Sequence, residues 1–450
     1  MQSAPHNKKP ASLRVLMLVH GYPPREQAGT ENHTQTLAHG LRTNGHTVHI
    51  VSATRAPGDE QYSVWEEPGI TRIVNNITVR PLGQCEKDPV IDSIIEEKAA
   101  EFEPDVVHIQ HLQFLSAGFK LDVPAVITLH DGWLWCAAGG TEILPNGTLC
   151  PHPSPTLCAD CASHWTPIIT QRGQRLVDLA GHLSPWVPAD RLHALYKRSP
   201  QALKTWVSRS PTQAPRTPKS SPKAAEARNQ TMLQLAQNAA VRIAPSQFLA
   251  DKAERMGLGK VMAIPHGVDQ KLESSHKQSH RSGLLFLGTI GAHKGPDLVV
   301  DAWKRAFPNQ VAPTTGAPVP LSLHGDVSQS SLANGHPIGR RLNRSEVQKA
   351  LSNAQALVMG SRWPENAPMV IVEARAAQCP VIAPNIGGIP ELIEEGVDGW
   401  LYPMGDSQAL AEAMISAVSS PLSSVRPPPH LQTQVDATVK AYRTAQGQQP

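Results

Sequence analysis

Two carboxylates, Glu365 and Glu373, lie eight positions apart and could bind the hydroxyl groups of a ligand. Residues 363–366 are typical of a loop leading into a helix, whose N-terminus offers unpaired N–H groups and a positive dipole end suited to a phosphate. At a rise of about 1.5 Å per residue, Glu373 would lie ~12 Å beyond Glu365 on roughly the same face. That separation suits a sugar at one end and a ribose at the other. The alternative is a surface helix with two solvated glutamates.

A glycine-rich loop carries the next candidate, Lys294. Residues 288–295, GTIGAHKG, follow an apolar run at 284–287 and precede a helical pattern. Glycines such as Gly288 let the backbone approach a diphosphate, and Lys294 supplies a point charge. The spacing matches neither a Walker loop nor a dinucleotide-binding loop. Because ligands bind at the carboxyl edge of parallel sheets, Lys294 and Glu365 are expected to serve one site. The alternative is a surface lysine beside a tight turn.

His130 follows an apolar run at 125–129 in the first half of the chain. We expect it to face the second half across a cleft, where it could donate to a sugar hydroxyl or help position a leaving phosphate. A histidine that only caps a strand end is the alternative. His111 could line the same cleft, whereas His108 falls within a strand and favours a structural role.

Four cysteines, Cys136, Cys150, Cys158 and Cys161, form the pattern C-x13-C-x7-C-x2-C in a proline-rich stretch. Four thiolates within 26 residues predict a closed, structural metal site, for which zinc is the first choice. An iron–sulfur cluster and two labile disulfides are the alternatives. His152 and His164 are spare ligands. Of the remaining two cysteines, Cys379 should be a buried thiol beside a strand and Cys85 a plain thiol.

Alternating strand and helix patterns must position these residues. We expect a doubly wound α/β domain at 12–265, a linker within 265–282, a second such domain at 270–418 and a tail at 419–450 whose last helix returns to the first domain. Expected helices fall at 30–43, 91–102, 231–239, 245–256, 296–307 and 434–445. Buried parallel strands are expected at 13–20, 48–51, 106–109, 125–129, 241–244, 261–264, 284–287, 321–324, 356–358 and 381–383.

A basic, proline-rich insert is expected at 185–230. Between Arg191 and Ala225 stand eight Lys or Arg and no Asp or Glu. The Pro-, Ser- and Lys-rich piece at 208–223 favours a disordered or mobile loop. Apolar residues within 192–207 could form a basic amphipathic helix on an anionic membrane surface. The alternative is a solvated loop that packs a few apolar groups against the N-terminal domain.

Composition excludes several classes of function. A net charge of +3 over 450 residues is too small to indicate nucleic-acid binding. No apolar run approaches the ~18 residues that a transmembrane helix requires. The polar start, MQSAPHNKKP, does not resemble a signal peptide. We therefore expect a cytoplasmic protein, with possible peripheral contact on the inner face of the membrane.

At the level of motifs the chain resembles retaining, nucleotide-sugar-dependent glycosyltransferases of family 4, which have the GT-B fold. The resemblance rests on GYPP, AGTENHTQTLAHGLRTNGHTVHIVS, PDVVHIQH, VITLHD, IPHGVD, FLGTIGAHKGPD and, above all, WPENAPMVIVEARAAQCPVIAPNIGGIPELIEEGVDGWLYP. It implies transfer to a glycan or lipid-linked acceptor in polysaccharide biosynthesis, without a required catalytic metal. The four-cysteine insert resembles one found in a subset of the family.

The resemblance also implies roles for individual residues. Glu365 would contact donor-sugar hydroxyls and Glu373 the ribose, while Lys294 would hold the diphosphate. His130 would stand at the donor–acceptor junction, and the N–H of Gly29 would approach a phosphate or the acceptor. The remaining implied donor contacts are Gly288, Asn366, Ala367, Met369 and Val370.

Two positions depart from the family pattern. Thr289 stands where many members carry Arg, so Arg362 or another residue would have to compensate, and Pro368 stands where many carry Gly. The missing cation keeps a second hypothesis open, a catalytically weak nucleotide-sugar scaffold or sensor. A third hypothesis is an interaction module in which the cysteine site and the basic insert recruit a partner or a membrane.

Overall fold

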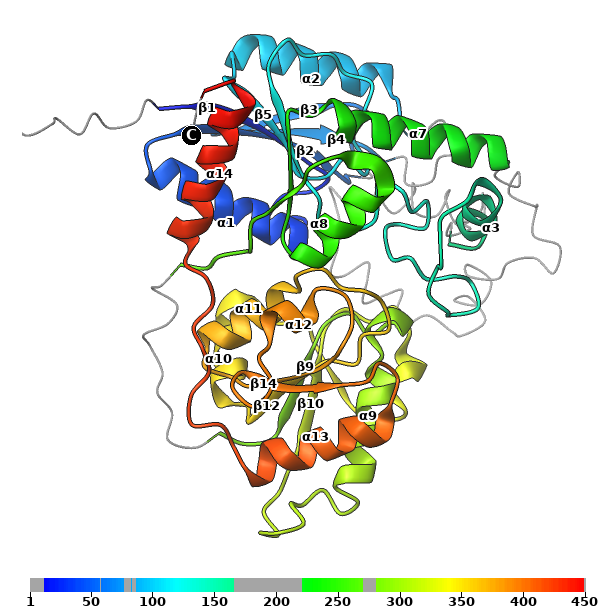
Figure 1. The fold of residues 1–450 in the computed structure, drawn as a ribbon, viewed down its shortest axis with the longest axis vertical. Helices are drawn as coiled ribbons and strands as arrows, with labels where there is room; N and C mark the ends of the chain where they lie inside the picture. Colours follow the sequence, from blue (N-terminus) through cyan, green and yellow to red (C-terminus); the bar gives the residue numbers. More distant parts are fainter. Residues whose placement is uncertain are drawn as a thin grey trace, which may run out of the picture.

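A computed structural model describes residues 12–56, 58–76, 82, 86–165, 221–269 and 281–448, except the side chains of 163–165. Two α/β domains lie one above the other, and the final helix, α14, lies beside the N-terminal domain (Figure 1). The expected fold class, two doubly wound Rossmann-like domains, is confirmed.

The N-terminal sheet has the order β3-β4-β2-β1-β5-β6-β7-β8. Neighbouring strands in this sheet are parallel, except for β3 and β4, which are antiparallel. Alternate residues of β1 enter opposite cores: Leu16 packs with α2, α7 and α8, and Met17 with α1 and α14. Because both faces are covered, β1 is apolar almost throughout. The strands are β1 Arg14–Val19, β2 Thr47–Thr54, β3 Val64–Glu67, β4 Ile70–Val74, β5 Val106–Ile109, β6 Ala125–Thr128, β7 Val241–Ala244 and β8 Met262–Ala263, and the helices are α1 Gly29–Thr43, α2 Pro89–Phe102, α3 Pro155–Trp165, α7 Pro222–Asn238, α8 Gln247–Ala253 and a π-helical turn Glu254–Leu258.

The C-terminal sheet is parallel, with the order β11-β10-β9-β12-β13-β14. Helices α9 and α13 pack on one face, and α10, α11 and α12 pack on the other. The strands are β9 Leu284–Leu287, β10 Leu321–His324, β11 Ile338–Gly339, β12 Ala356–Val358, β13 Val381–Pro384 and β14 Gly399–Tyr402, and the helices are α9 Pro296–Ala306, α10 Arg344–Asn353, α11 Met369–Ala376, α12 Ile389–Leu392, α13 Ser407–Ser419 and α14 Leu431–Ala445, with 3-10 turns at Ala292–Lys294 and Ser330–Ala333.

Helix α14 leaves the second domain and packs against α1 of the first, as Figure 1 shows. The contact is close, because a Cβ on Gly40 would stand 2.6 Å from the Val435 side chain. The buried Tyr442 hydroxyl lies 2.6 Å from Nδ1 of His108, whose Nε2 lies 2.7 Å from Thr128. Both ring nitrogens of His108 thus have partners, and its role is structural, between β5 and α14.

One sequence expectation is wrong at the insert. Residues 222–230, placed in the insert before a helix expected at 231, form the first half of α7, which begins inside the expected loop at 208–223. Ser221 caps this helix by accepting from the N–H of Ala224, and Pro222 occupies the first turn, where its missing N–H costs nothing. Ala224, Ala225 and Ala227 then favour the helix, although the surrounding composition is basic. The predicted loop and amphipathic helix at 185–220 lie outside the described residues.

Candidate active site

Lys294 stands between two tight turns at the carboxyl end of β9. Residues 292–294 form a 3-10 turn, and Gly295 adopts a left-handed conformation with φ +57° before α9 begins. A Cβ on Gly295 would stand 2.1 Å from the carbonyl oxygen of Gly360, at the end of β12. Glycine at this position therefore lets the lysine loop pack directly on the chain that leads to Glu365.

Glu365 is buried, and its carboxylate pairs with Lys294. The Lys294 Nζ lies 3.0 and 2.9 Å from the two carboxylate oxygens, and Ser361 Oγ donates to Oε1. Trp363 lies beside the ammonium, with its ring centre 5.4 Å from Nζ. Thus the structure brings together the two residues that the sequence placed 71 positions apart, with each satisfying the other's charge.

The geometry first estimated for the two glutamates is wrong. Helix α11 begins only at Met369, after Pro368, so Glu365 belongs to the preceding loop and a helical rise does not connect it to Glu373. The Gly387–Gly388 turn holds this loop, because the Gly388 N–H donates to the Glu365 carbonyl at 2.7 Å. Met369 and Val370 occupy the first turn of α11, where N–H groups lack an intrahelical partner, and Ala367 precedes that turn.

Glu373 lies half-buried on α11. Burial raises the pKa of its carboxyl to about 7, with Arg344 opposing that shift. A group with this pKa changes charge near neutral pH, unlike an exposed glutamate.

Asn366 joins the two domains at His130. Its side-chain amide donates to the His130 carbonyl oxygen at 3.0 Å, and Nε2 of His130 lies 2.8 Å from Oε1 of Gln110. His130 follows β6 and shares the lining of a small cavity with Gln110, His111 and Asp131. The Glu365 loop thus lies directly against the strand end that carries His130.

Two further histidines, which the sequence analysis did not select, stand behind His130. The rings of His33 and His266 lie 5.0 and 5.9 Å from that of His130. Burial first, and then the neighbouring imidazoles, hold the pKa of His130 well below its usual value, and burial lowers that of His33 to about 4. The three rings are therefore neutral at physiological pH.

These three histidines could in principle hold a metal ion. Their ring nitrogens include one from each residue that lie within 4.8 Å of one another, which the structure shows for this group within the described ranges. Hydrogen bonding disfavours a metal among them. The Gly267 N–H donates to Gln434 Oε1 at 2.8 Å, so the Gln434 amide nitrogen faces Nε2 of His33 at 2.6 Å. His33 Nε2 then accepts, which puts the ring proton on Nδ1 and leaves no free lone pair for a metal.

A second histidine chain borders His130. His111 Nε2 lies 3.7 Å from Asp131, and His20 Nε2 lies 3.1 Å from Glu31. The His20 and His111 rings meet edge to face at 4.5 Å. Burial acts to raise the pKa of Asp131, but His111, the Trp133 N–H and His20 together outweigh it, so the pKa lies below its usual value. Asp131 is therefore a carboxylate.

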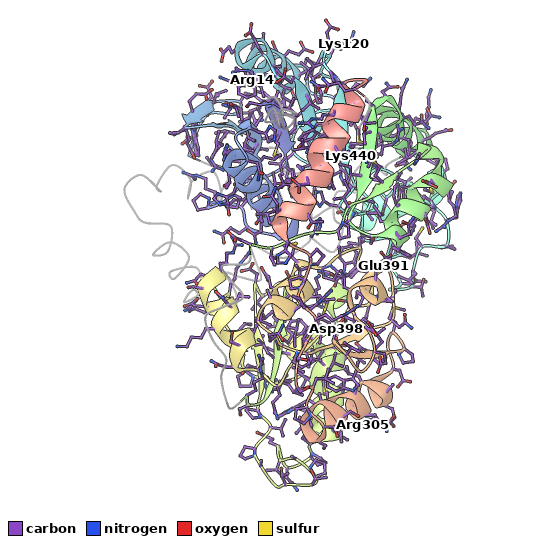
Figure 2. All side chains as sticks on the ribbon, turned by 60° about the vertical axis from the view of Figure 1, so that its left-hand side comes forward. Arg14, Lys120, Arg305, Glu391, Asp398 and Lys440 are labelled. Carbon is purple, nitrogen blue, oxygen red and sulfur yellow. The ribbon has the colours of Figure 1, made fainter. Side chains whose placement is uncertain are left out.

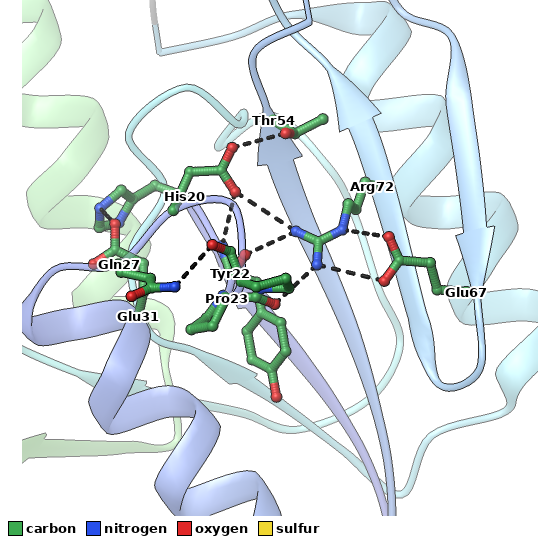
Figure 3. A network of polar contacts seen from close by, with 10 residues as sticks. His20, Tyr22, Pro23, Gln27, Glu31, Thr54, Glu67 and Arg72 are labelled. Carbon is green, nitrogen blue, oxygen red and sulfur yellow. Dashed lines mark hydrogen bonds and ion pairs between the residues drawn. The ribbon is translucent and has the colours of Figure 1, made fainter. Parts of the chain in front are cut away.

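The loop from His20 to Gly29 is held by Arg72, a residue that the sequence analysis missed because strand β4 was not expected. Figure 3 shows its buried guanidinium donating to the carbonyls of Tyr22 and Pro23, at 2.8 and 3.0 Å, and pairing with Glu67 at 2.7 Å. Gly29 begins α1 just beyond this network and is exposed. An added Cβ on Gly29 would meet no atom within 4 Å, so a ligand could approach it.

Arg362, the residue named to compensate for the cation missing at Thr289, is itself paired in the structure. Both of its terminal nitrogens pair with Asp297, at 2.9 and 2.7 Å. Arg341 instead reaches across the domains, pairing with Asp326 at 2.5 Å and donating to the Gln27 carbonyl.

The four clustered cysteines line one cavity. None is in a disulfide, and Cys136, Cys158 and Cys161 are buried. Cys379 is a buried thiol in the second domain, as expected, whereas Cys85 and the side chain of His164 lie outside the described residues. Among the described helices, none has the length and apolar character needed to cross a membrane.

Two family models match separate parts of the chain. The model described as glycosyl transferases group 1 matches residues 268–429, and the model described as glycosyltransferase family 4 matches residues 28–148. The first match covers Lys294 and Glu365, and the second covers His130.

Curated relatives match over shorter segments. An amylovoran biosynthesis glycosyltransferase of Erwinia amylovora is 38% identical over 16% of this chain and 19% of its own. The alpha-maltose-1-phosphate synthase of Mycolicibacterium smegmatis is 32% identical over 32% of this chain and 40% of its own. The chain thus spans less than half the length of these two relatives.

Solved structures match over nearly the whole chain. A sucrose-phosphate synthase from Thermosynechococcus elongatus has a TM-score of 0.56 at 15% identity, covering 97% of this chain and 94% of its own. The Anabaena protein HepE, in complex with UDP and glucose, has a TM-score of 0.54 at 15% identity, covering 97% and 95%. The GT-B fold expected from the sequence is confirmed.

Proposed function

We propose that this GT-B chain is a glycosyltransferase that moves a sugar from a nucleotide-diphospho-sugar to an acceptor with retention of anomeric configuration. The observation that carries the proposal is the Lys294–Glu365 pair at the end of β9, joined through the neighbouring Asn366 to His130 of the other domain. The loop that carries a cation–carboxylate pair thereby contacts the residue that carries a neutral imidazole, where the two domains touch.

The donor would lie mainly on the second domain. Lys294, with the Gly288 loop and the first-turn N–H groups of Met369 and Val370, would bind the diphosphate. Glu365 would accept hydrogen bonds from sugar hydroxyls and Glu373 from the ribose. Because Lys294 and Glu365 pair with each other in the structure, donor binding would replace their mutual contact with contacts to phosphate and sugar.

The reaction would proceed on one face of the sugar. The acceptor hydroxyl oxygen bonds to the anomeric carbon as the bond from that carbon to the diphosphate oxygen breaks. The leaving oxygen takes the electron pair and then the acceptor proton. Lys294 and the α11 N-terminus would stabilise the charge on this oxygen, so the step needs neither a covalent intermediate nor a catalytic metal.

The similar proteins supply the first substrates to test. Because the structures of HepE hold UDP-glucose and UDP, UDP-glucose is the first donor to test. Similarity to a glycosyltransferase of amylovoran biosynthesis favours a glycan or lipid-linked acceptor in polysaccharide assembly. The proposal also includes a cytoplasmic location with peripheral contact at the membrane, as expected from the sequence.

A panel of UDP-, GDP- and ADP-sugars, read by release of nucleoside diphosphate, tests the proposal. With the active donor, Lys294→Ala and Glu365→Ala should each lose about 2–4 kcal/mol of transition-state stabilisation in kcat/KM. Lys440→Ala and Glu412→Ala, on exposed faces of α14 and α13, are matched controls. Near-wild-type turnover in both site variants would refute the assignment. Retention is tested by the anomeric configuration of the product.

One observation favours a second function, a nucleotide-sugar sensor that does not transfer. Thr289 supplies no charge, and Arg362 is paired with Asp297, so the diphosphate site has one cation fewer than the family pattern. Donor binding in calorimetry without release of nucleoside diphosphate, with or without acceptors, would identify this function.

A further inference from the structure

Three separate segments bring cysteines to one cavity beside the His130 loop. Cys136 ends a turn in which its N–H donates to the Gly132 carbonyl at 2.8 Å. Cys150 follows a short hairpin closed by the Ile143–Leu149 bridge, and Cys158 and Cys161 lie one turn apart on α3. The cavity lining is Cys136, Ala137, Ala138, Glu142, Ile143, Cys150, Pro153, Leu157, Cys158 and Cys161.

Burial removes three of the four thiols from solvent. Cys136, Cys158 and Cys161 are only 5–7% exposed. Cys136 and Cys161 pack with the large core of the N-terminal domain, and Cys158 packs in a small cluster with Ala159 and Ala225. None of the four cysteines is in a disulfide, so four free thiols line one cavity.

We propose that Cys136, Cys150, Cys158 and Cys161 bind one structural Zn²⁺ ion. A tetrahedral site with Zn–S bonds of about 2.3 Å holds sulfurs roughly 3.8 Å apart. In the structure the thiols surround the cavity at wider spacing, because no three of them lie within 4.8 Å of one another in the part of the chain described. Cys158 and Cys161 of α3 would supply one edge of the site, and metal binding would draw the Cys136 and Cys150 thiols toward it.

Nearby contacts extend the site to the His130 loop. Arg228 of α7 donates to the carbonyls of Trp133 and of Leu134, the latter at 3.0 Å. The adjacent Asn229 directs its amide at Cys158 Sγ, 3.6 Å away. A metal would therefore tie α3, α7 and the segment that starts directly after His130 into one unit. This consequence for His130 rests on the proposed function, but the metal site does not.

Four thiolates leave no open coordination position, which makes the role structural. The competing metal site is the His33, His130 and His266 group, which the Gln434 amide disfavours by occupying a ring nitrogen of His33. The two locations give opposite results on mutation, so a single experiment separates them.

The experiment uses the full chain, purified under reducing conditions without added metal, and measures metal content and thiol reactivity. We expect about one zinc per chain and, after replacement by Co²⁺, the absorption of a tetrahedral thiolate complex. Cys158→Ser and Cys161→Ser should lose the metal, whereas Cys379→Ser, which alters a buried thiol in the other domain, and His266→Ala should keep it.

Wild-type protein supplies a readout that does not depend on folding of the variants. Chelation should make four additional thiols reactive and lower Tm, and Zn²⁺ should reverse both changes. Absence of metal, an iron–sulfur chromophore, two disulfides in reduced-buffer preparations, or zinc that survives Cys158→Ser but is lost from His266→Ala would each overturn the proposal.

Discussion

At the scale of single residues, Glu373 gives the proposed donor site a pH dependence. Its pKa is raised by burial to about 7, so the folded protein favours the neutral carboxyl below that pH. Ribose hydroxyls donate more strongly to a carboxylate, so donor binding should favour the ionised form. We expect the Kd of a nucleoside diphosphate to rise by up to about tenfold per pH unit as pH falls below 7, measured by calorimetry.

Replacement of Glu373 by Gln should remove this dependence and leave weak, pH-independent binding. The raised pKa also makes a stability contribution that is present below pH 4.5 and is lost as pH rises through about 7, so the unliganded Gln variant should gain relative stability at pH 8. A pH profile of binding that is identical in the wild type and Glu373→Gln would contradict the role given to this carboxyl.

Residue chemistry could be predicted from sequence where one segment carried the signal. Lys294 and Glu365 each lie in a recognisable loop, and parallel-sheet topology predicted that they serve one site. The His33–Gln434 contact carries no such signal, because 401 positions separate its partners and both residues resemble ordinary helix positions. The only local signal for His266 was its place directly after an expected strand, and that segment was assigned to the linker.

At the scale of elements, the Gly387–Gly388 turn sets the position of Glu365. A Cβ on Gly388, whose φ of −87° is ordinary, would stand 1.9 Å from the Asn366 carbonyl oxygen. Gly388→Ala should therefore push the Glu365 loop away from Lys294 and reduce kcat/KM by about 10²-fold, the effect of a shift near 1 Å in a catalytic group. Steady-state kinetics with the active donor measures this.

Gly316→Ala is the control for the same substitution without a close neighbour. Its Cβ would meet nothing within 4 Å, although φ is +67°. We expect backbone strain to lower its stability by about 1 kcal/mol while kcat/KM is unchanged. If Gly388→Ala retained full kcat/KM, the turn would not position Glu365.

Elements were predictable in proportion to the regularity of their burial. Strands β1 and β9, covered on both faces, appear as unbroken apolar runs. Strand β3 has the sequence VWEE and is largely exposed at the sheet edge, so its composition does not distinguish it from a loop. Helix α7 was partly missed because charge and proline content dominate its N-terminal flank, while the capping by Ser221 is a one-residue signal.

At the scale of the whole molecule, polar contacts made by Asn366, Arg341 and Glu391 join the domains across the site in the part of the chain that the structure describes. Asn366 donates to the His130 carbonyl, Arg341 donates to the Gln27 carbonyl, and Glu391 of α12 binds the N-terminus of α8. Glu391 lies at the boundary between the domains in Figure 2. Because each domain has its own core, these contacts set the relative position of the domains more than their folding.

Glu391 makes the most specific of these contacts. Its two oxygens accept from the N–H groups of Gln247 and Phe248, at 2.7 and 2.6 Å, and its charge complements the helix dipole. Glu391→Gln leaves one acceptor oxygen and turns an amide donor toward the other N–H. Because charged hydrogen bonds contribute about 1.5–3 kcal/mol, we expect the domains to separate and kcat/KM to fall about tenfold or more.

Small-angle scattering and kinetics measure the two effects on the same samples. The radius of gyration of Glu391→Gln should exceed that of the wild type without donor and approach it at saturating donor, since a bound donor would itself bridge the domains. Glu412→Gln, whose carboxylate contacts only Gln408 within α13 in the described structure, should match the wild type in both measurements. Unchanged scattering together with an unchanged kcat/KM would show that the contact between α8 and α12 does not set the relative position of the domains. The Tm of Glu391→Gln should equal that of the wild type in either case, because Glu391 joins two domains that each have their own core.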